Sequence, residues 1–149
     1  NRSKRELERL KRIAKTEGMW DPTEGGADAV RFRDQIALLE VDIVALEMLV
    51  LRVLSAEKSG KNSLDIAGLL KIKGSEIQQR YAELMMLAAG PFAMPFIEEA
   101  MEAGWQGNFP GGVVANAPLA STYFNLRKTT IYGGSNEVQR NIVAQTVLG

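Results

Sequence analysis

The chain lacks two residue types on which much protein chemistry depends. Among its 149 residues there is no cysteine and no histidine. The first absence excludes disulfides and thiolate chemistry, and the second removes the side chain that most often acts as a general base near neutral pH. A chain without cysteine also fits a reducing compartment, so we expect a cytoplasmic protein, and we predict no metal site.

Net charge and long apolar runs are missing as well. Eighteen basic residues balance eighteen acidic ones, so the overall charge favours neither nucleic acid nor an anionic membrane as a partner. There is no apolar run of about twenty residues and no signal-peptide pattern, and we therefore expect a soluble protein without a membrane span. Because the chain starts at Asn1 and not at a methionine, we expect a fragment of a longer protein.

Apolar residues recur at helical spacing through most of the chain, of which 46% is hydrophobic. Ser3 to Glu6 is a capping-box pattern and predicts a helix to about residue 16, whose many basic residues form a solvated face. A loop is expected over 18–26. Two long helices follow, over about 28–58 and 64–89, and Gly90-Pro91 ends the second.

The first long helix carries two apolar rows. Two rows predict contacts on two sides, which suits a helix inside a bundle or between a bundle and another subunit. The wide face from Ile36 to Val53 is the expected subunit contact. One row consists of Ile36, Leu39, Ile43, Leu46, Val50 and Val53, and the other of Ala37, Val44, Met48 and Leu51.

The helical pattern loosens after the second long helix. A short helix is expected over 95–103, followed by a Gly/Pro-rich loop over 105–118 that is long enough to be a binding loop or an inter-subunit arm. We expect Trp105 and Phe109 to anchor this loop on its own domain. Another short helix, over 120–128, then leads into a Gly-Gly turn.

No segment alternates cleanly between apolar and polar residues, so no strand is predicted. The fold class is therefore all-α, and we predict an up-and-down four-helix bundle. The N-terminal helix and the short helix near Pro95 are expected to pack outside it. We divide the chain into an N-terminal helix and loop, residues 1–29, and a helical domain, residues 30–149.

The Gly-Gly turn at Gly133 and Gly134 is the most informative local feature. Ser135 follows it and opens a helix whose apolar positions are Val138, Ile142, Val143 and Val147. Two glycines let the backbone approach a ligand closely, Ser135 can cap the helix, and the unpaired amides of the first turn form an anion site. On its own, such a turn is more often a plain connection.

The wider string from Tyr123 to Ile142, YFNLRKTTIYGGSNEVQRNI, resembles the C-terminal signature of the acyl-CoA dehydrogenases. In that family a basic residue, an Ile-Tyr pair, a Gly-Ser/Thr turn and a Glu-Ile/Val-Gln-Arg helix start follow in this order. The string is most similar to bacterial members, among them the large subunits of pimeloyl-CoA dehydrogenases. Weaker likeness reaches back to about Val30, so the C-terminal helical domain of that family would span 30–149.

The resemblance implies FAD beside the turn, often the flavin of a neighbouring subunit. Gly134, Ser135, Asn136 and Glu137 would contact this cofactor, Ser135 through its hydroxyl and the next two residues through their amides. Arg127 and Arg140 match basic positions of the family. The resemblance suggests that Arg127 could position the turn or pair with an acid. For Arg140 it suggests an ion pair between subunits or a ligand contact.

The sequence departs from the family at two places. In one branch a catalytic Glu follows the Ile-Tyr pair, where this chain has Gly133; other branches place the base on an earlier helix, which would precede Asn1. We assign no catalytic residue to this chain. Many members also carry a Gln and a Gly-Gly pair near the flavin pyrophosphate, where this chain reads Met85 to Pro91, MMLAAGP.

The implied function is that of an FAD-dependent acyl-CoA dehydrogenase of fatty acid metabolism. Such an enzyme desaturates acyl-CoA thioesters and passes electrons to an electron-transfer flavoprotein. It binds acyl-CoA with domains that this chain lacks, so we expect the fragment alone to be inactive, and we expect a homo- or hetero-oligomer. Two alternatives stay open: a non-catalytic supporting subunit of a heteromeric dehydrogenase, and a stand-alone helical interaction module.

Overall fold

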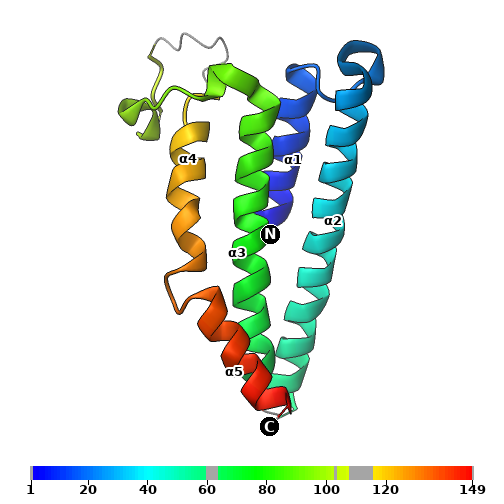
Figure 1. The fold of residues 1–149 in the computed structure, drawn as a ribbon, viewed down its shortest axis with the longest axis vertical. Coiled ribbons are helices and arrows are strands. Elements are labelled where there is room, and N and C mark those ends of the chain that lie inside the picture. The colour runs from blue at the N-terminus through cyan, green and yellow to red at the C-terminus, as the bar shows by residue number, and fades with distance from the viewer. Residues whose placement is uncertain (1, 60–63, 103, 108–115, 149) are drawn as a thin grey trace.

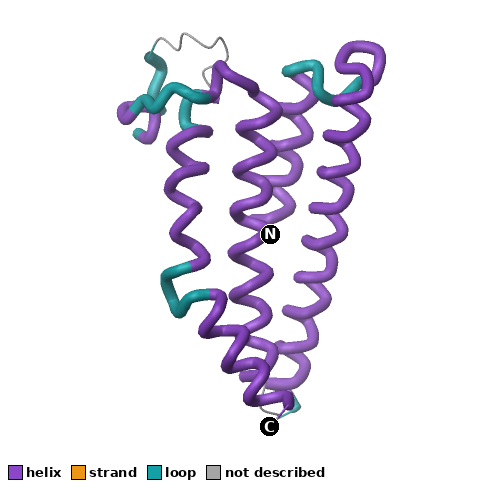
Figure 2. Tube along the Cα trace, in the orientation of Figure 1, coloured by secondary structure: helices purple, strands orange, loops and turns teal. Residues whose placement is uncertain are grey.

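The computed structural model describes residues 2–59, 64–102, 104–107 and 116–148. No strand occurs in this part of the chain, which confirms the predicted all-α class (Figure 2). The helices are α1 (Arg2–Thr16), α2 (Pro22–Lys58), α3 (Leu64–Ala89), α4 (Leu119–Leu126) and α5 (Asn136–Leu148), and three short 3₁₀ segments are η1 (Gly90–Ala93), η2 (Glu98–Met101) and η4 (Arg127–Thr130) (Figure 1).

The helices occupy the four positions of an up-and-down bundle. In Figure 1, α1 and α3 run upward, α2 runs downward, and α4 and α5 run downward one after the other. The fourth position is thus shared by two short helices. Helix α3 packs against each of the other four, and the connection between α4 and α5 lies against its side at mid-height.

The hydrophobic core includes the N-terminal helix. Helix α1 packs against α2 and α3, and four of its residues are buried in the hydrophobic core, so the expectation that this helix packs outside the bundle is wrong. These four residues lie on one face of the helix, and this face is buried while the charged faces are exposed to solvent. The core residues of α1 are Leu7, Leu10, Ile13 and Ala14, and the same hydrophobic cluster includes Phe32, Ile36, Leu39, Ile43, Ile77, Tyr81, Leu84, Met85, Leu119 and Leu126 of the other helices.

Helix α2 begins earlier than predicted because Asp21 caps it. The Asp21 carboxylate accepts hydrogen bonds from the Thr23 amide at 2.8 Å and the Thr23 hydroxyl at 2.7 Å, and Pro22 takes the first helical position. These hydrogen bonds lower the pKa of Asp21. Gly26 then interrupts the helix with φ 56° and ψ −141°. The predicted loop over 18–26 is therefore helical in its second half.

Only one of the two apolar rows of α2 faces the core. Ile36, Leu39, Ile43 and Val53 are buried and Leu46 is packed against the core, whereas Val50 is exposed. All of the second row is exposed: Ala37, Val44, Met48 and Leu51. The face predicted to contact another subunit is thus the intramolecular one, and the second row is the apolar surface that remains open.

Other helix boundaries agree with the prediction or differ by a turn. Helix α3 ends at Gly90, which adopts φ 64°. Ser3, expected at the start of the first helix, is the second residue of α1. In place of a helix over 95–103 there is one 3₁₀ turn, η2. Trp105 is half-buried. Phe109 and residues 60–63, between the two long helices, lie outside the described residues. Within them, no helix is both long and apolar enough to cross a bilayer.

Candidate functional site

The Gly-Gly turn connects η4 to α5 and depends on both glycines. Gly133 has φ 69° and Gly134 has φ 89°, a region that side chains with a Cβ rarely occupy. The Gln139 side chain folds back over the turn, and its Nε2 donates to the Gly133 carbonyl at 3.3 Å. A Cβ at Gly134 would meet that Nε2 at 2.6 Å. Both glycines are exposed, so the backbone of the turn is open to a ligand.

Ser135 caps α5, as predicted. Its hydroxyl oxygen accepts from the Val138 amide at 3.4 Å, and its carbonyl accepts from the Gln139 amide at 2.9 Å. These two contacts satisfy part of the first helical turn. The serine is therefore fixed at the point where the helix dipole is positive.

Glu137 turns its carboxylate back onto the same helix start. The pKa of this exposed group is lowered, first by its own backbone amide and then by the Ser135 hydroxyl, with smaller contributions from Arg140 and Lys71. An anion is thus already stabilised by donors at the N-terminus of α5. An external phosphate or carboxylate would accept hydrogen bonds from those donors in place of the Glu137 carboxylate.

Asn136 faces the opposite way, into the bundle. It is 5% exposed, and its Oδ1 accepts hydrogen bonds from Lys71 Nζ at 2.8 Å and from Ser75 Oγ at 3.2 Å. Lys71 Nζ also donates to the Thr130 carbonyl at 3.2 Å. Only the backbone of Asn136 is left to face a ligand, and its side chain ties the turn to α3.

Gln79 makes a second set of contacts to the same connection. Its Nε2 donates to the carbonyls of Leu126 at 3.2 Å and Arg127 at 3.1 Å, and its Oε1 accepts from Arg127 Nη2. Lys71, Ser75 and Gln79 are not among the site residues predicted from the sequence. A signal was present, because the three polar residues recur at i, i+4 and i+8 on one face of a helix otherwise rich in apolar residues.

The two arginines that match family positions are both engaged within the chain. The Arg127 guanidinium lies 4.9 Å from the Tyr123 ring centroid and donates to the Tyr123 hydroxyl at 3.1 Å. Arg140 pairs with Glu76 of α3 at 3.0 Å. Each cation therefore helps to hold the α4–α5 segment on α3.

A small hollow of about 260 Å³ lies between α3 and the turn. There is free space beside Gly74, since a Cβ built on this residue would have no atom within 4 Å. The hollow brings exposed backbone of the turn next to the Lys71 side chain. It is lined by Leu70, Lys71, Gly74, Ser75, Gln78, Thr129, Tyr132 and Gly133.

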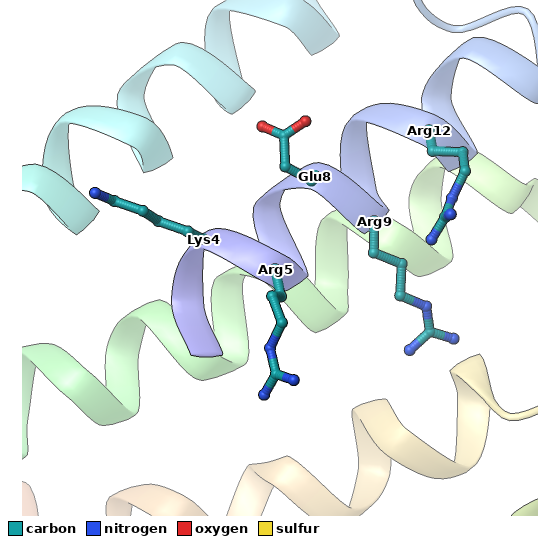
Figure 3. A pocket seen from close by; sticks show the side chains of 5 residues that line it. All are labelled: Lys4, Arg5, Glu8, Arg9 and Arg12. Atoms are coloured by element: carbon teal, nitrogen blue, oxygen red, sulfur yellow. The ribbon is translucent and has the colours of Figure 1, made fainter. Parts of the chain in front are cut away.

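Two other regions contribute no polar site next to the turn. Met85 and Met86 are 1% and 7% exposed and belong to the core, so the end of α3 presents hydrocarbon and sulfur to its neighbours. A larger hollow, about 610 Å³, lies on the flank of α1. Figure 3 shows Arg5, Arg9 and Arg12 extending from the same side of this helix, and no residue of the turn lines that hollow.

Residues 21–148 match the family model described as acyl-CoA dehydrogenase, C-terminal domain. The matched range contains α2 to α5 and the Gly-Gly turn, and it leaves out α1. No curated protein matches the chain. Among the described residues, no group of three or more Asp or Glu side chains is placed to hold a metal ion.

Proposed function

Since the chain belongs to the acyl-CoA dehydrogenase family as its C-terminal domain, we propose that it is the helical domain of an FAD-dependent enzyme that desaturates acyl-CoA thioesters. Such an enzyme would pass its electrons to an electron-transfer flavoprotein. The observation that carries the proposal is the turn at Gly133 and Gly134, which opens directly onto the capped N-terminus of α5.

The residues at the turn fit the phosphate or ribityl region of FAD. The Ser135 hydroxyl and the Glu137 amide already stabilise a carboxylate, that of Glu137 itself, and a phosphate oxygen accepts hydrogen bonds from the same kind of donors. Gly134 offers backbone without a side chain, and Asn136 contributes its amide alone because its side chain is buried. When bound, the flavin would supply the acceptor for the hydride from the β-carbon of the thioester.

This domain holds the cofactor and leaves proton abstraction to another part of the enzyme. A carboxylate must reach the α-carbon of the substrate, and Gly133 has no side chain at the position where one family branch carries its Glu. Glu137 is engaged by the start of its own helix. The catalytic base and most acyl-CoA contacts are therefore assigned to segments other than this chain, so the isolated domain should be inactive.

The decisive experiment uses the full-length protein that contains this domain. Its flavin absorbance is recorded as purified, and then straight-chain and dicarboxylic acyl-CoA thioesters are added without oxygen. Bleaching of the flavin by one class would support a dehydrogenase and name its substrate. Bleaching by a pimeloyl-CoA-like thioester would support the finer subtype. A flavin-free protein that gains no absorbance on incubation with FAD would contradict the proposal.

A variant pair tests the turn itself. Ser135→Ala removes the hydroxyl donor and should lower the flavin content of the purified protein, whereas Ser55→Ala, on the exposed surface of α2, should not. Equal flavin content in the two variants would argue against a cofactor contact at Ser135.

A supporting subunit of a heteromeric dehydrogenase is the second candidate. It is favoured by Gly133 in place of an acid and by the apolar end of α3 at Met85 and Met86. In that case the protein would carry flavin that no thioester bleaches until a partner subunit is added. The family match removes the support for a stand-alone interaction module.

We also propose that α2 joins this domain to another subunit, whether identical or not. Its exposed apolar row supports this, with Val44 48%, Met48 52% and Leu51 57% exposed. Val44→Asp combined with Met48→Asp should reduce the sedimentation coefficient of the full-length protein, and Asp42→Asn should leave it unchanged. An unchanged coefficient in the double variant would contradict an interface here. A cytoplasmic location stays a prediction.

A further inference from the structure

One face of α3 carries polar side chains that form hydrogen bonds with the connection between α4 and α5. We propose that Lys71, Ser75 and Gln79 are positioning residues, which hold the Gly133–Gly134 turn in the conformation that receives an anionic cofactor. The inference rests on the proposed function for the identity of the ligand. The conformational part concerns the described contacts alone and can be tested without any ligand.

The spacing of the three residues matches the segment they hold. Lys71, Ser75 and Gln79 follow each other at one-turn intervals, so they span about 12 Å along α3 at 1.5 Å per residue. Gln79 binds the end of α4 at Leu126 and Arg127, and Lys71 and Ser75 bind Asn136 at the start of α5. Both ends of the connection are therefore fixed to one rigid helix.

The contact between Ser75 and Asn136 is shielded from water, whereas the contacts of Gln79 with Arg127 are exposed. Ser75 and Asn136 are each 5% exposed, and Thr129, which lies between the two anchor points, is 3% exposed. A buried acceptor such as Asn136 Oδ1 loses favourable energy when its donors are removed, because water cannot easily replace them. In this conformation of the connection, Asn136 Oδ1 and the Thr129 hydroxyl both have hydrogen-bond partners.

Lys71 also brings a positive charge to the start of α5. Its ammonium group is hydrogen-bonded to Asn136, the first residue of α5, so a positive charge sits beside the positive end of the helix dipole. It also contributes to the lowered pKa of Glu137. A phosphate at the turn would experience the same field, so Lys71 favours both the shape and the charge of the site.

The alternative is that these residues stabilise the bundle in general and have no specific effect on the turn. The two possibilities differ in where a substitution acts. A general contribution would raise amide exchange throughout α3 and its neighbours, whereas a positioning role would raise it mainly over residues 131–139.

Lys71→Met and Gln79→Leu test the inference in the full-length protein. Their matched controls are Lys73→Met, whose ammonium pairs with Glu76, and Gln145→Leu, at an exposed position of α5 that does not line the hollow beside the turn. Hydrogen exchange over 131–139 should accelerate about tenfold or more in the test variants relative to α1, as the loss of a charge-assisted hydrogen bond implies. Lys71→Arg should restore part of the protection.

Flavin dissociation gives the second readout. The test variants should release flavin about tenfold faster than the controls. Exchange over 131–139 that rises no more than in the controls overturns the inference, whatever the flavin does. If the wild-type protein binds no flavin while the turn still loosens in the test variants, the proposed function fails and the positioning role stands.

Discussion

The two ends of the bundle are built differently. The closed half consists of α1, α4, residues 27–45 of α2 and residues 77–89 of α3, and it holds the main hydrophobic core. The open half consists of α5, residues 46–58 of α2 and residues 64–76 of α3. In α5 the one fully buried side chain is that of Asn136, and Val138, Ile142 and Val147 are 44–60% exposed.

The difference indicates which half is stabilised mainly by apolar burial within the chain and which half is held mainly by polar contacts. The closed half buries its apolar side chains within the chain, which is the dominant source of stability. In the open half, α3 holds the turn through hydrogen bonds and packs against α5. Several apolar side chains of this half stay exposed. Apolar surface of this kind is what the subunit contact proposed for α2 would cover.

The largest expected effect is in the closed half. Leu84 is fully buried, so Leu84→Ala should lower the free energy of unfolding by about 2–5 kcal/mol through lost burial and a cavity. Leu87 lies on the same helix but is 51% exposed, and Leu87→Ala should cost less than about 0.5 kcal/mol. Chemical denaturation of both variants measures the contrast, and similar losses would show that the division into halves is wrong.

The next effect concerns the packing of α5 on α3. A Cβ at Gly68 would lie 2.8 Å from Val143 Cγ2, so Gly68→Val should cost about 1–3 kcal/mol and loosen α5 first. At Gly74 nothing lies within 4 Å, and Gly74→Ala should stabilise α3 by about 0.5–1 kcal/mol. Hydrogen exchange in α5 reports the first change. Exchange that rises equally in α1 would mean that the open half does not unfold independently.

A smaller effect is expected at a buried hydroxyl of the closed half. Ser121 is 4% exposed and its Oγ has no hydrogen-bond partner in the part of the chain that the structure describes. Ser121→Ala should therefore be neutral or stabilise the protein by up to about 1 kcal/mol. Thr129→Val should cost about 1 kcal/mol, because the Thr129 hydroxyl donates to the Leu126 carbonyl at 2.7 Å. Thermal unfolding distinguishes the two, and a clear loss of stability for Ser121→Ala would reveal a partner for this hydroxyl.

The smallest effect is a pH dependence at the start of α5. The pKa of Glu137 is lower in the folded chain than its ordinary value of 4.5. Its ionised form therefore stabilises the helix start above pH 4.5, and this contribution is lost as the pH falls through the folded-state pKa. NMR titration of the Glu137 amide should follow this loss, and Glu137→Gln should abolish the transition. A transition that persists in the variant would have to come from another group.

Regular apolar spacing made most of the helices predictable, because a helix needs one continuous face to bury. It could not decide which row of α2 faces the core, since Ile43 and Val44 are equally suited to burial. The position of α1 was also missed, because the capping pattern and the many charges around Leu7 and Leu10 describe a helix without saying what covers it.

The turn was predictable from local chemistry, whereas its anchorage was not. Gly133, Gly134 and Ser135 act through their own backbone and an adjacent helix start, so the sequence carries the information directly. The hydrogen bonds from Lys71 and Gln79 join residues 47 to 65 positions apart. Such contacts depend on how the helices pack against one another. A local sequence pattern does not predict that packing.

Helix α1 gives an apparently neutral chain a marked electrical asymmetry. Its fifteen residues include seven basic and two acidic ones, so it carries a charge of +5 while the rest of the chain carries −5. Lys4 and Lys11 are neutralised by Glu47 and Glu40 of α2, but Arg5 and Arg12 have no acidic partner among the described residues. At low ionic strength, where charges act beyond 10 Å, the molecule should be retained by a cation exchanger although its isoelectric point is about 6.6.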